Sequence, residues 1–145
     1  MKKIATILLS VLLFAGISCK QQATPQSAQQ QPVVAASGND IEVYYFHMTT
    51  RCVTCRAVEA ETRKNIEMLY PEQFNSGKIT FTALNIDEES GKFMGDQLGI
   101  SGQTLLIVKG DKKFNITSEG FMYAEGKPEK YQSIIRQKID SLLVE

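Results

Sequence analysis

The chain has 145 residues, which suits a single domain, and its 43% hydrophobic and 22% charged residues are ordinary for a soluble globular protein. Its 16 basic and 16 acidic side chains cancel. Without a basic excess, the composition does not favour nucleic acid as a partner.

The first 18 residues are typical of a signal peptide. Two lysines precede an apolar run at 4–17, which is shorter than the roughly 20 residues that a transmembrane helix needs. The run ends in Ala-Gly-Ile-Ser-Cys, which resembles the lipobox of bacterial lipoproteins, with Gly16 in the place of the usual leucine. The resemblance implies cleavage before Cys19 and lipidation of that residue. An ordinary secretory peptide or an uncleaved anchor is the alternative.

Residues 19–39 are predicted to form a flexible tether after the lipidated cysteine. The stretch is rich in glutamine, alanine, serine and proline, and it cannot bury enough apolar surface to offset the entropy of ordering. A short edge strand at 33–36 is the one element that it could add. Such a tether would let a domain reach partners near the membrane. We therefore expect a periplasm-facing membrane lipoprotein of the bacterial cell envelope.

The folded domain is predicted at 40–145 and begins with a strand. Residues 41–47 are β-branched, aromatic and almost wholly apolar, which favours a strand covered on both faces. A helix follows, with Cys55, Val58, Thr62, Ile66 and Leu69 along one face, and Pro71 ends it. Residues 78–87 predict a second strand. Residues 88–98 predict a weaker helix that buries its larger apolar side chains, Phe93, Met94 and Leu98.

The last part of the domain predicts a hairpin and a helix. Strands are expected at 104–110 and 113–118, because a Gly-Asp turn separates two runs of strand-forming residues. Pro128 suits the first turn of the final helix. The buried stripe of this helix is expected to be Tyr131, Ile134, Ile135, Ile139, Leu142 and Leu143. The fold class is therefore α/β, in the order β-α-β-α-β-β-α, with a mixed central sheet flanked by helices.

This order of strands and helices, with a Cys-x-x-Cys motif where the first strand leads into the first helix, resembles the thioredoxin fold. Leu-Asn-Ile-Asp at 84–87 resembles the end of the family's central strand. Residues 98–112 resemble its Gly-Ile-x-Gly-Ile-Pro-Thr-Leu segment and the hairpin after it. With the lipobox and the glutamine-rich tether, Cys-Val-Thr-Cys-Arg is similar to small thioredoxin-like lipoproteins of the ArsF type, which are labelled as subunits of nitrophenyl-compound nitroreductases.

The sequence departs from the thioredoxin pattern around the cysteines. Gln103 stands before Thr104, where the family usually has a proline. Arg51 precedes Cys52 in the place of a tryptophan, and Val-Thr replaces the usual Gly-Pro between the cysteines. The family's buried aspartate has no clear counterpart at 44–46. The resemblance implies that Gln103 faces the cysteine pair, so Arg51, Gln103 and Thr104 are candidate modulators of the site.

Cys52 and Cys55 are the candidate catalytic residues. Thiol–disulfide exchange needs a thiolate that attacks and a second thiol that releases the mixed disulfide. A helix N-terminus stabilises a nearby anion by about 0.3–1 kcal/mol, and up to roughly 2 kcal/mol when partly buried. Together with the charge of Arg51, this could lower the pKa of Cys52 by roughly one to two units. Cys52 is thus the predicted attacking thiol, and Cys55, deeper in the helix, the resolving thiol.

Other interpretations of the two thiols stay open. A passive disulfide would close a loop of only about four residues, and a loop that short stabilises little. A zinc site normally has four ligands, and the chain has no second Cys-x-x-Cys motif. A two-coordinate ion such as Cu(I) could bind to the two thiols, with His47 and Met48 as conceivable further ligands. A third interpretation is an accessory subunit of a larger reductase. We expect a thiol–disulfide oxidoreductase that needs no cofactor or metal and acts on protein thiols or disulfides near the membrane.

Overall fold

The structure is a computed structural model that describes residues 40–144. The predicted signal peptide, the lipidated Cys19 and the tether, including its short strand, lie outside the described residues. The elements in chain order are β1 (Ile41–His47), α1 (Val53–Leu69), α2 (Pro71–Asn75), β2 (Ile79–Asn85), α3 (Glu89–Leu98), β3 (Thr104–Lys109), β4 (Lys112–Asn115), α4 (Thr117–Tyr123) and α5 (Pro128–Leu143).

The four strands form one mixed sheet in the order β2-β1-β3-β4. β1 runs parallel to β2 and antiparallel to β3, and β3 and β4 form an antiparallel hairpin. In the centre, Val43 of β1 lies opposite Phe81 on one side and Ile107 on the other. The predicted fold class, α/β with a mixed sheet flanked by helices, is confirmed.

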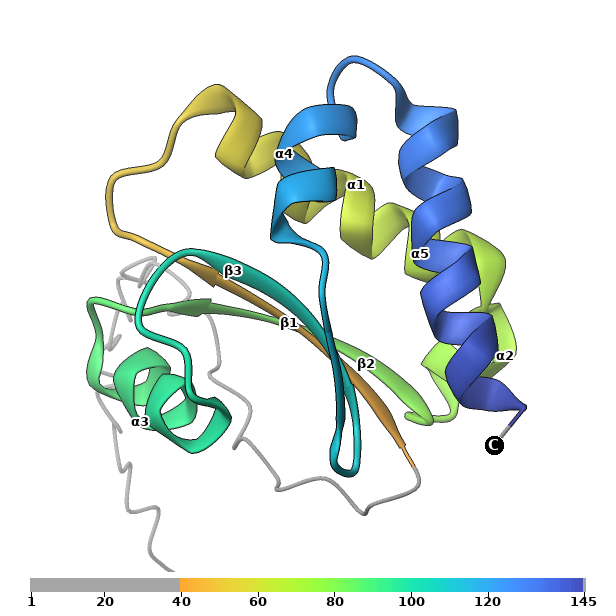
Figure 1. The fold of residues 1–145 in the computed structure, drawn as a ribbon, viewed down its shortest axis with the longest axis horizontal. Coiled ribbons are helices and arrows are strands. Elements are labelled where there is room, and N and C mark those ends of the chain that lie inside the picture. The colour runs from red at the N-terminus through yellow and green to blue at the C-terminus, as the bar shows by residue number, and fades with distance from the viewer. Residues whose placement is uncertain (1–39, 145) are drawn as a thin grey trace, which may run out of the picture. The chain divides into compact units, whose positions relative to one another are not determined.

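The helices cover the two faces of the sheet unequally. α1, α2, α4 and α5 lie on one side of it, and α3 lies on the other (Figure 1). On the four-helix side, Val58 of α1 and Tyr131 of α5 are fully buried in the same cluster as Tyr45 of β1. On the α3 side, Tyr44 and Phe46 of β1 form a second cluster, to which α3 contributes partly buried side chains. Alternation along β1 therefore sends Tyr45 toward the helix that carries the cysteines.

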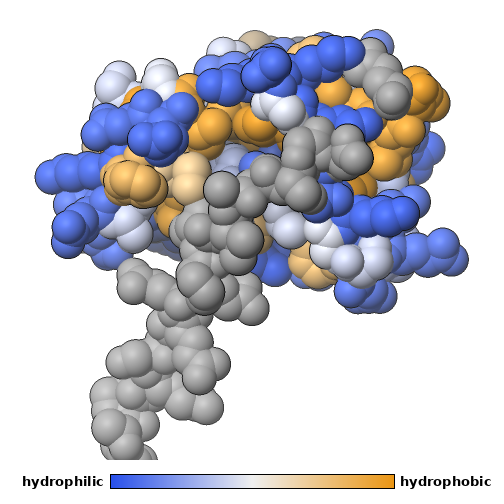
Figure 2. Space-filling view, turned by 90° about the horizontal axis from the view of Figure 1, so that it is seen from below, coloured by the Kyte–Doolittle hydropathy of each residue, from blue (hydrophilic) through white to orange (hydrophobic). Residues whose placement is uncertain are grey.

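The α3 side has a mixed surface. Figure 2 views it and shows hydrophobic residues set among hydrophilic ones. Within residues 40–144, no helix combines the length and the apolar character that crossing a bilayer requires.

The loop between β1 and α1 is tied to the end of β2. The backbone N–H of Thr49 donates to the carboxylate of Asp87 at 2.8 Å, and the side-chain amide of Asn85 donates to Thr49 Oγ1 at 3.0 Å. Hydrogen bonds from the backbone N–H and the side chain of Thr49 hold the pKa of Asp87 below its usual range. The loop that leads into the cysteines is thus held by the neighbouring parallel strand.

Two helices were not predicted from the sequence. α2 starts at the proline that ends α1, because proline suits the first turn of a new helix as well as the stop of an old one. α4 begins at Thr117, inside the stretch 113–118 that is predicted as a strand. The observed strand β4 ends at Asn115. The Asn115 side chain accepts from both the backbone N–H and the hydroxyl of Thr117, and this turn favours the start of a helix.

Two of the side chains expected to be buried are exposed. Phe93 of α3 is 64% exposed, because the tight face of that helix is made by Gly91 and Gly95. Leu143, the last residue of α5, is 40% exposed, whereas Tyr131, Ile135, Ile139 and Leu142 form the buried stripe.

Candidate active site

Cys52 and Cys55 lie at the N-terminus of α1: Cys52 directly precedes the helix, and Cys55 is in its first turn. Cys52 is the N-cap residue, and its Sγ accepts a hydrogen bond from the backbone N–H of Cys55 at 3.0 Å. A sulfur therefore takes the position that a serine or aspartate oxygen usually fills at a helix start.

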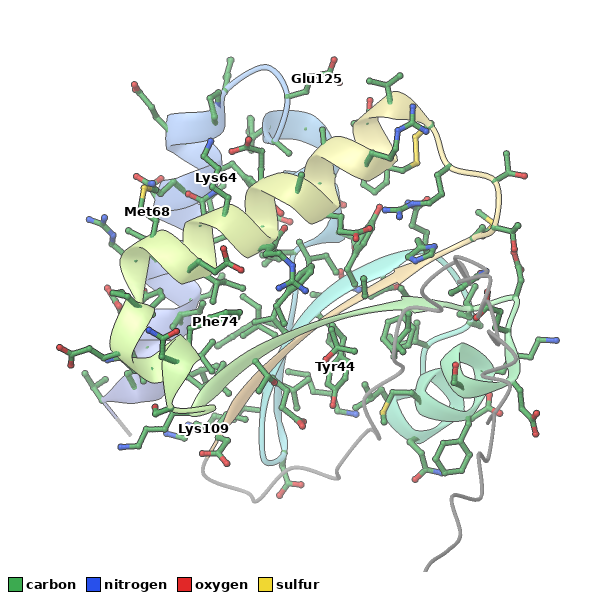
Figure 3. The ribbon with its side chains drawn as sticks, turned by 180° about the vertical axis from the view of Figure 1, so that it is seen from behind. Tyr44, Lys64, Met68, Phe74, Lys109 and Glu125 are labelled. Atoms are coloured by element: carbon green, nitrogen blue, oxygen red, sulfur yellow. A yellow bond between two sulfur atoms is a disulfide. The ribbon has the colours of Figure 1, made fainter. Side chains whose placement is uncertain are left out.

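The two sulfurs form a disulfide, and they differ in access to solvent. Cys52 is exposed, whereas Cys55 is only 6% exposed. Figure 3 shows the bond as a yellow stick at the first turn of α1. Because a thiolate must reach a sulfur along the S–S axis from outside, an incoming group can attack Cys52 far more readily than Cys55.

Arg51 lies beside the pair, but its charge is already engaged. Its guanidinium forms an ion pair with Glu59, and it stands over the ring of Tyr45 at 5.9 Å from the centroid. The Arg51 carbonyl accepts from Arg56 Nη1 at 2.9 Å. A paired arginine contributes less to stabilising a nearby thiolate than a free one. The hydrogen bond to the Cys52 sulfur comes from the backbone N–H of Cys55. That the charge of Arg51 helps to lower the pKa of the Cys52 thiol stays a prediction.

Gln103 approaches the buried cysteine from the start of β3. Its Oε1 lies 3.9 Å from the Cys55 sulfur, and its Nε2 donates to the Tyr45 hydroxyl at 2.7 Å. Tyr45 in turn donates to the Cys55 carbonyl oxygen at 2.9 Å. Thr104 is buried next to Gln103, and its hydroxyl donates to the Gly102 carbonyl rather than to a sulfur.

The sequence patterns do not single out Tyr45 as a residue of the site. It is fully buried below Cys55, and burial is the main reason why the pKa of its phenol is raised, so the hydroxyl stays neutral. The available signal was alternation along β1, because residues 41, 43 and 45 share the face that the cysteine-bearing helix covers. The resemblance to thioredoxins implies a buried aspartate near the cysteines, and a tyrosine does not match that pattern.

The remaining candidates lie outside this cluster or serve the local fold. His47 Nδ1 is 3.0 Å from the Met48 carbonyl oxygen, and Met48 is 46% exposed. Among residues 40–144, no three His, Cys, Asp or Glu side chains are grouped as a metal site would need. Thr54 donates to Glu125 at 3.1 Å, which ties the loop between α4 and α5 to the first turn of α1. Figure 3 labels Glu125 in that loop.

The comparisons with known proteins place solved thioredoxins among the similar structures. Thioredoxin O2 from Arabidopsis thaliana, in its oxidised state, is 22% identical, with a TM-score of 0.47 over 69% of this chain and 76% of that one. Thioredoxin f2 from Chlamydomonas reinhardtii is 21% identical, with a TM-score of 0.44 over 76% and 82%. The mixed sheet, and the cysteine pair where β1 leads into α1, agree with the thioredoxin-like arrangement that the sequence resembles.

A third similar structure is a malarial protein, which is 16% identical, with a TM-score of 0.38 over 52% of this chain and 75% of that one. No family model and no curated protein matches the chain. The resemblance to lipoproteins of the ArsF type thus stays a prediction.

Proposed function

We propose that the protein is a thiol–disulfide oxidoreductase whose reacting groups are Cys52 and Cys55. The observation that carries the proposal is the Cys52–Cys55 disulfide at a helix N-terminus, with Cys52 exposed and Cys55 buried. A purely structural disulfide needs neither the helix start nor this asymmetry, and it closes too short a loop to stabilise the chain much.

The chemistry divides into two exchange steps. In the first, the Cys52 thiolate attacks a substrate disulfide, one substrate sulfur leaves as a thiolate, and a mixed disulfide forms. In the second, Cys55 loses its proton and attacks the Cys52 sulfur. The second substrate thiolate leaves, and the Cys52–Cys55 disulfide forms. Two electrons pass to the substrate, and the same steps in reverse oxidise a substrate dithiol.

The helix start favours the first step. The Cys55 N–H that bonds the Cys52 sulfur at 3.0 Å in the disulfide can also bond it as a thiolate. A helix N-terminus stabilises a nearby anion by about 0.3–1 kcal/mol, which increases the thiolate fraction roughly two- to fivefold at neutral pH. The thiolate is the reactive form.

The proposal is tested by the reduction of insulin disulfides with dithiothreitol as the electron source. The test protein carries Cys19→Ser, so that only two thiols remain. The comparison protein carries Cys52→Ser and Cys55→Ser as well. We expect the first protein to accelerate insulin reduction in proportion to its concentration. Equal rates with both proteins would overturn the proposal. Tight stoichiometric binding of Cu(I) without any acceleration would instead support the soft-metal interpretation.

We also propose that the domain works outside the cytoplasm on a lipid anchor at Cys19. Support comes from the sequence: a lysine pair, a short apolar run, and a cysteine at its end followed by a polar stretch. The partners would then be protein thiols or disulfides close to the membrane. Disulfides persist in that compartment, which suits a redox-active pair.

The anchor is tested by expressing the full chain in a Gram-negative host with labelled palmitate. We expect the wild-type protein to carry the label and to partition into the detergent phase of a Triton X-114 extract. Cys19→Ser should lose the label and move to the aqueous phase, whereas Cys52→Ser should behave as the wild type. Label on Cys19→Ser, or none on the wild type, would contradict the proposal.

A further inference from the structure

The hydrogen bonds around Tyr45 determine which way the Gln103 amide points. A neutral tyrosine has a single hydroxyl proton, and Tyr45 uses it on the Cys55 carbonyl oxygen at 2.9 Å. Toward Gln103 the phenol oxygen can therefore only accept, which requires the NH2 group of the amide at that side. The nitrogen is committed to Tyr45 at 2.7 Å, and the amide oxygen is left facing the Cys55 sulfur.

This arrangement serves the two redox states of Cys55 differently. In the disulfide the sulfur carries no proton, so the amide oxygen at 3.9 Å receives no hydrogen bond from it. Reduction breaks the S–S bond with two electrons and gives Cys55 a proton, and the S–H can then donate to Gln103 Oε1. An ionised Cys55 would instead place a negative charge against the negative end of the amide dipole in a buried site.

We propose that Gln103, oriented by Tyr45, accepts a hydrogen bond from the S–H of reduced Cys55. This bond favours the reduced protein and disfavours ionisation of the resolving cysteine. Gln103 contacts the reacting sulfur, and Tyr45 is a positioning residue. The role rests on the proposed oxidoreductase function, because it concerns the resolving step at the same pair. It is specific to this chain's glutamine and tyrosine.

The effect is measured on the reduced chain carrying Cys19→Ser, by following the pH midpoint of the Cys55 Cβ chemical shift. We expect Gln103→Met, which keeps the side-chain length and removes the amide, to move the midpoint to lower pH. Gln103→Glu should move it to higher pH, because a carboxylate holds the neighbouring proton more firmly. Tyr45→Phe should move it in the same direction as Gln103→Met, because the freed amide can turn its NH2 group toward the sulfur.

The equilibrium with glutathione gives a second readout. One lost hydrogen bond in the reduced state should favour the oxidised form of Gln103→Met by about three- to tenfold. That corresponds to a potential roughly 14–30 mV more negative, at 29.6 mV per tenfold change. Gln132→Met is the matched control, because Gln132 donates to Asn65 in a contact between α5 and α1 that does not involve the cysteines. It should change neither readout.

The two proposals can fail separately. If the wild-type chain does not exchange with glutathione at all, the oxidoreductase function fails, while the pH midpoints still test the contact. If exchange is normal but Gln103→Met and Gln103→Glu leave the midpoint unchanged, or shift it in the same direction, the proposed role of Gln103 is wrong. A merely structural glutamine would not separate these two variants by sign.

Discussion

Cys55→Ser is expected to trap the protein as a mixed disulfide with its substrate through Cys52, and Cys52→Ser is expected to form no such adduct. The reason is the difference in exposure: Cys52 is open to solvent, and Cys55 is 6% exposed below it. Without the buried thiol, nothing inside the protein attacks the Cys52 sulfur to release the substrate. Turnover should fall by roughly a thousandfold or more in either variant, since each removes a reacting group.

The two variants differ in the species that accumulates. Both carry Cys19→Ser and are incubated with insulin or a disulfide peptide, quenched with acid and analysed by intact mass. Cys55→Ser should gain the mass of one substrate chain, and the gain should disappear with dithiothreitol. If the adduct forms equally on Cys52→Ser, the buried sulfur is accessible to substrate, and the assignment of attacking and resolving thiols is wrong.

Gly91→Ala is expected to destabilise the fold by about 3 kcal/mol, despite the better helix propensity of alanine. Gly91 lies in the first turn of α3, and a Cβ there would stand 1.9 Å from the carbonyl oxygen of Asn85 and 2.5 Å from its carbonyl carbon. Both atoms belong to the backbone at the end of β2, which cannot yield as a flexible side chain would. The helix must therefore move away from the strand or lose its first turn.

Urea unfolding monitored by circular dichroism measures this effect. Gly126→Ala is the matched control, because no atom lies within 4 Å of its added Cβ, and its effect should stay within about 0.5 kcal/mol. A loss below about 1 kcal/mol in Gly91→Ala would contradict the close packing of α3 on β2. A shift of Asn85 should also loosen the loop before Cys52, because the Asn85 side chain donates a hydrogen bond to Thr49 in that loop.

Local sequence signals were enough for the main elements and for the place of the cysteines. The apolar run of β1 and the helical spacing from Cys55 to Leu69 each have one consistent interpretation, and together they put the pair at a strand–helix junction. The two helices that the sequence did not predict, α2 and α4, have weak sequence signals. α4 contains Gly120 and only seven residues, and the β-branched residues at its start favoured a strand.

The side-chain network of the site depends on contacts between distant segments, which no local pattern records. The proximity of Gln103 to the cysteines was implied by the resemblance, but the bond from its amide to Tyr45 joins residues 58 positions apart. The pairing of Arg51 with Glu59 depends on the path of the loop before α1, so it could not be read from residues eight positions apart. Phe93 was misplaced because close approach by glycines, rather than apolar spacing, decides how α3 sits on the sheet.

The unequal exposure of Cys52 and Cys55 has a consequence for the direction of electron flow. In the proposed mechanism, an incoming thiolate that reduces the protein attacks the Cys52 sulfur, and the Cys52 thiolate attacks a substrate disulfide. By microscopic reversibility, reduction and oxidation then pass through one intermediate, with the partner always bound to Cys52. The same intermediate therefore serves both directions of the reaction. The potential of the Cys52–Cys55 pair relative to that of its partners decides whether the protein delivers electrons or removes them.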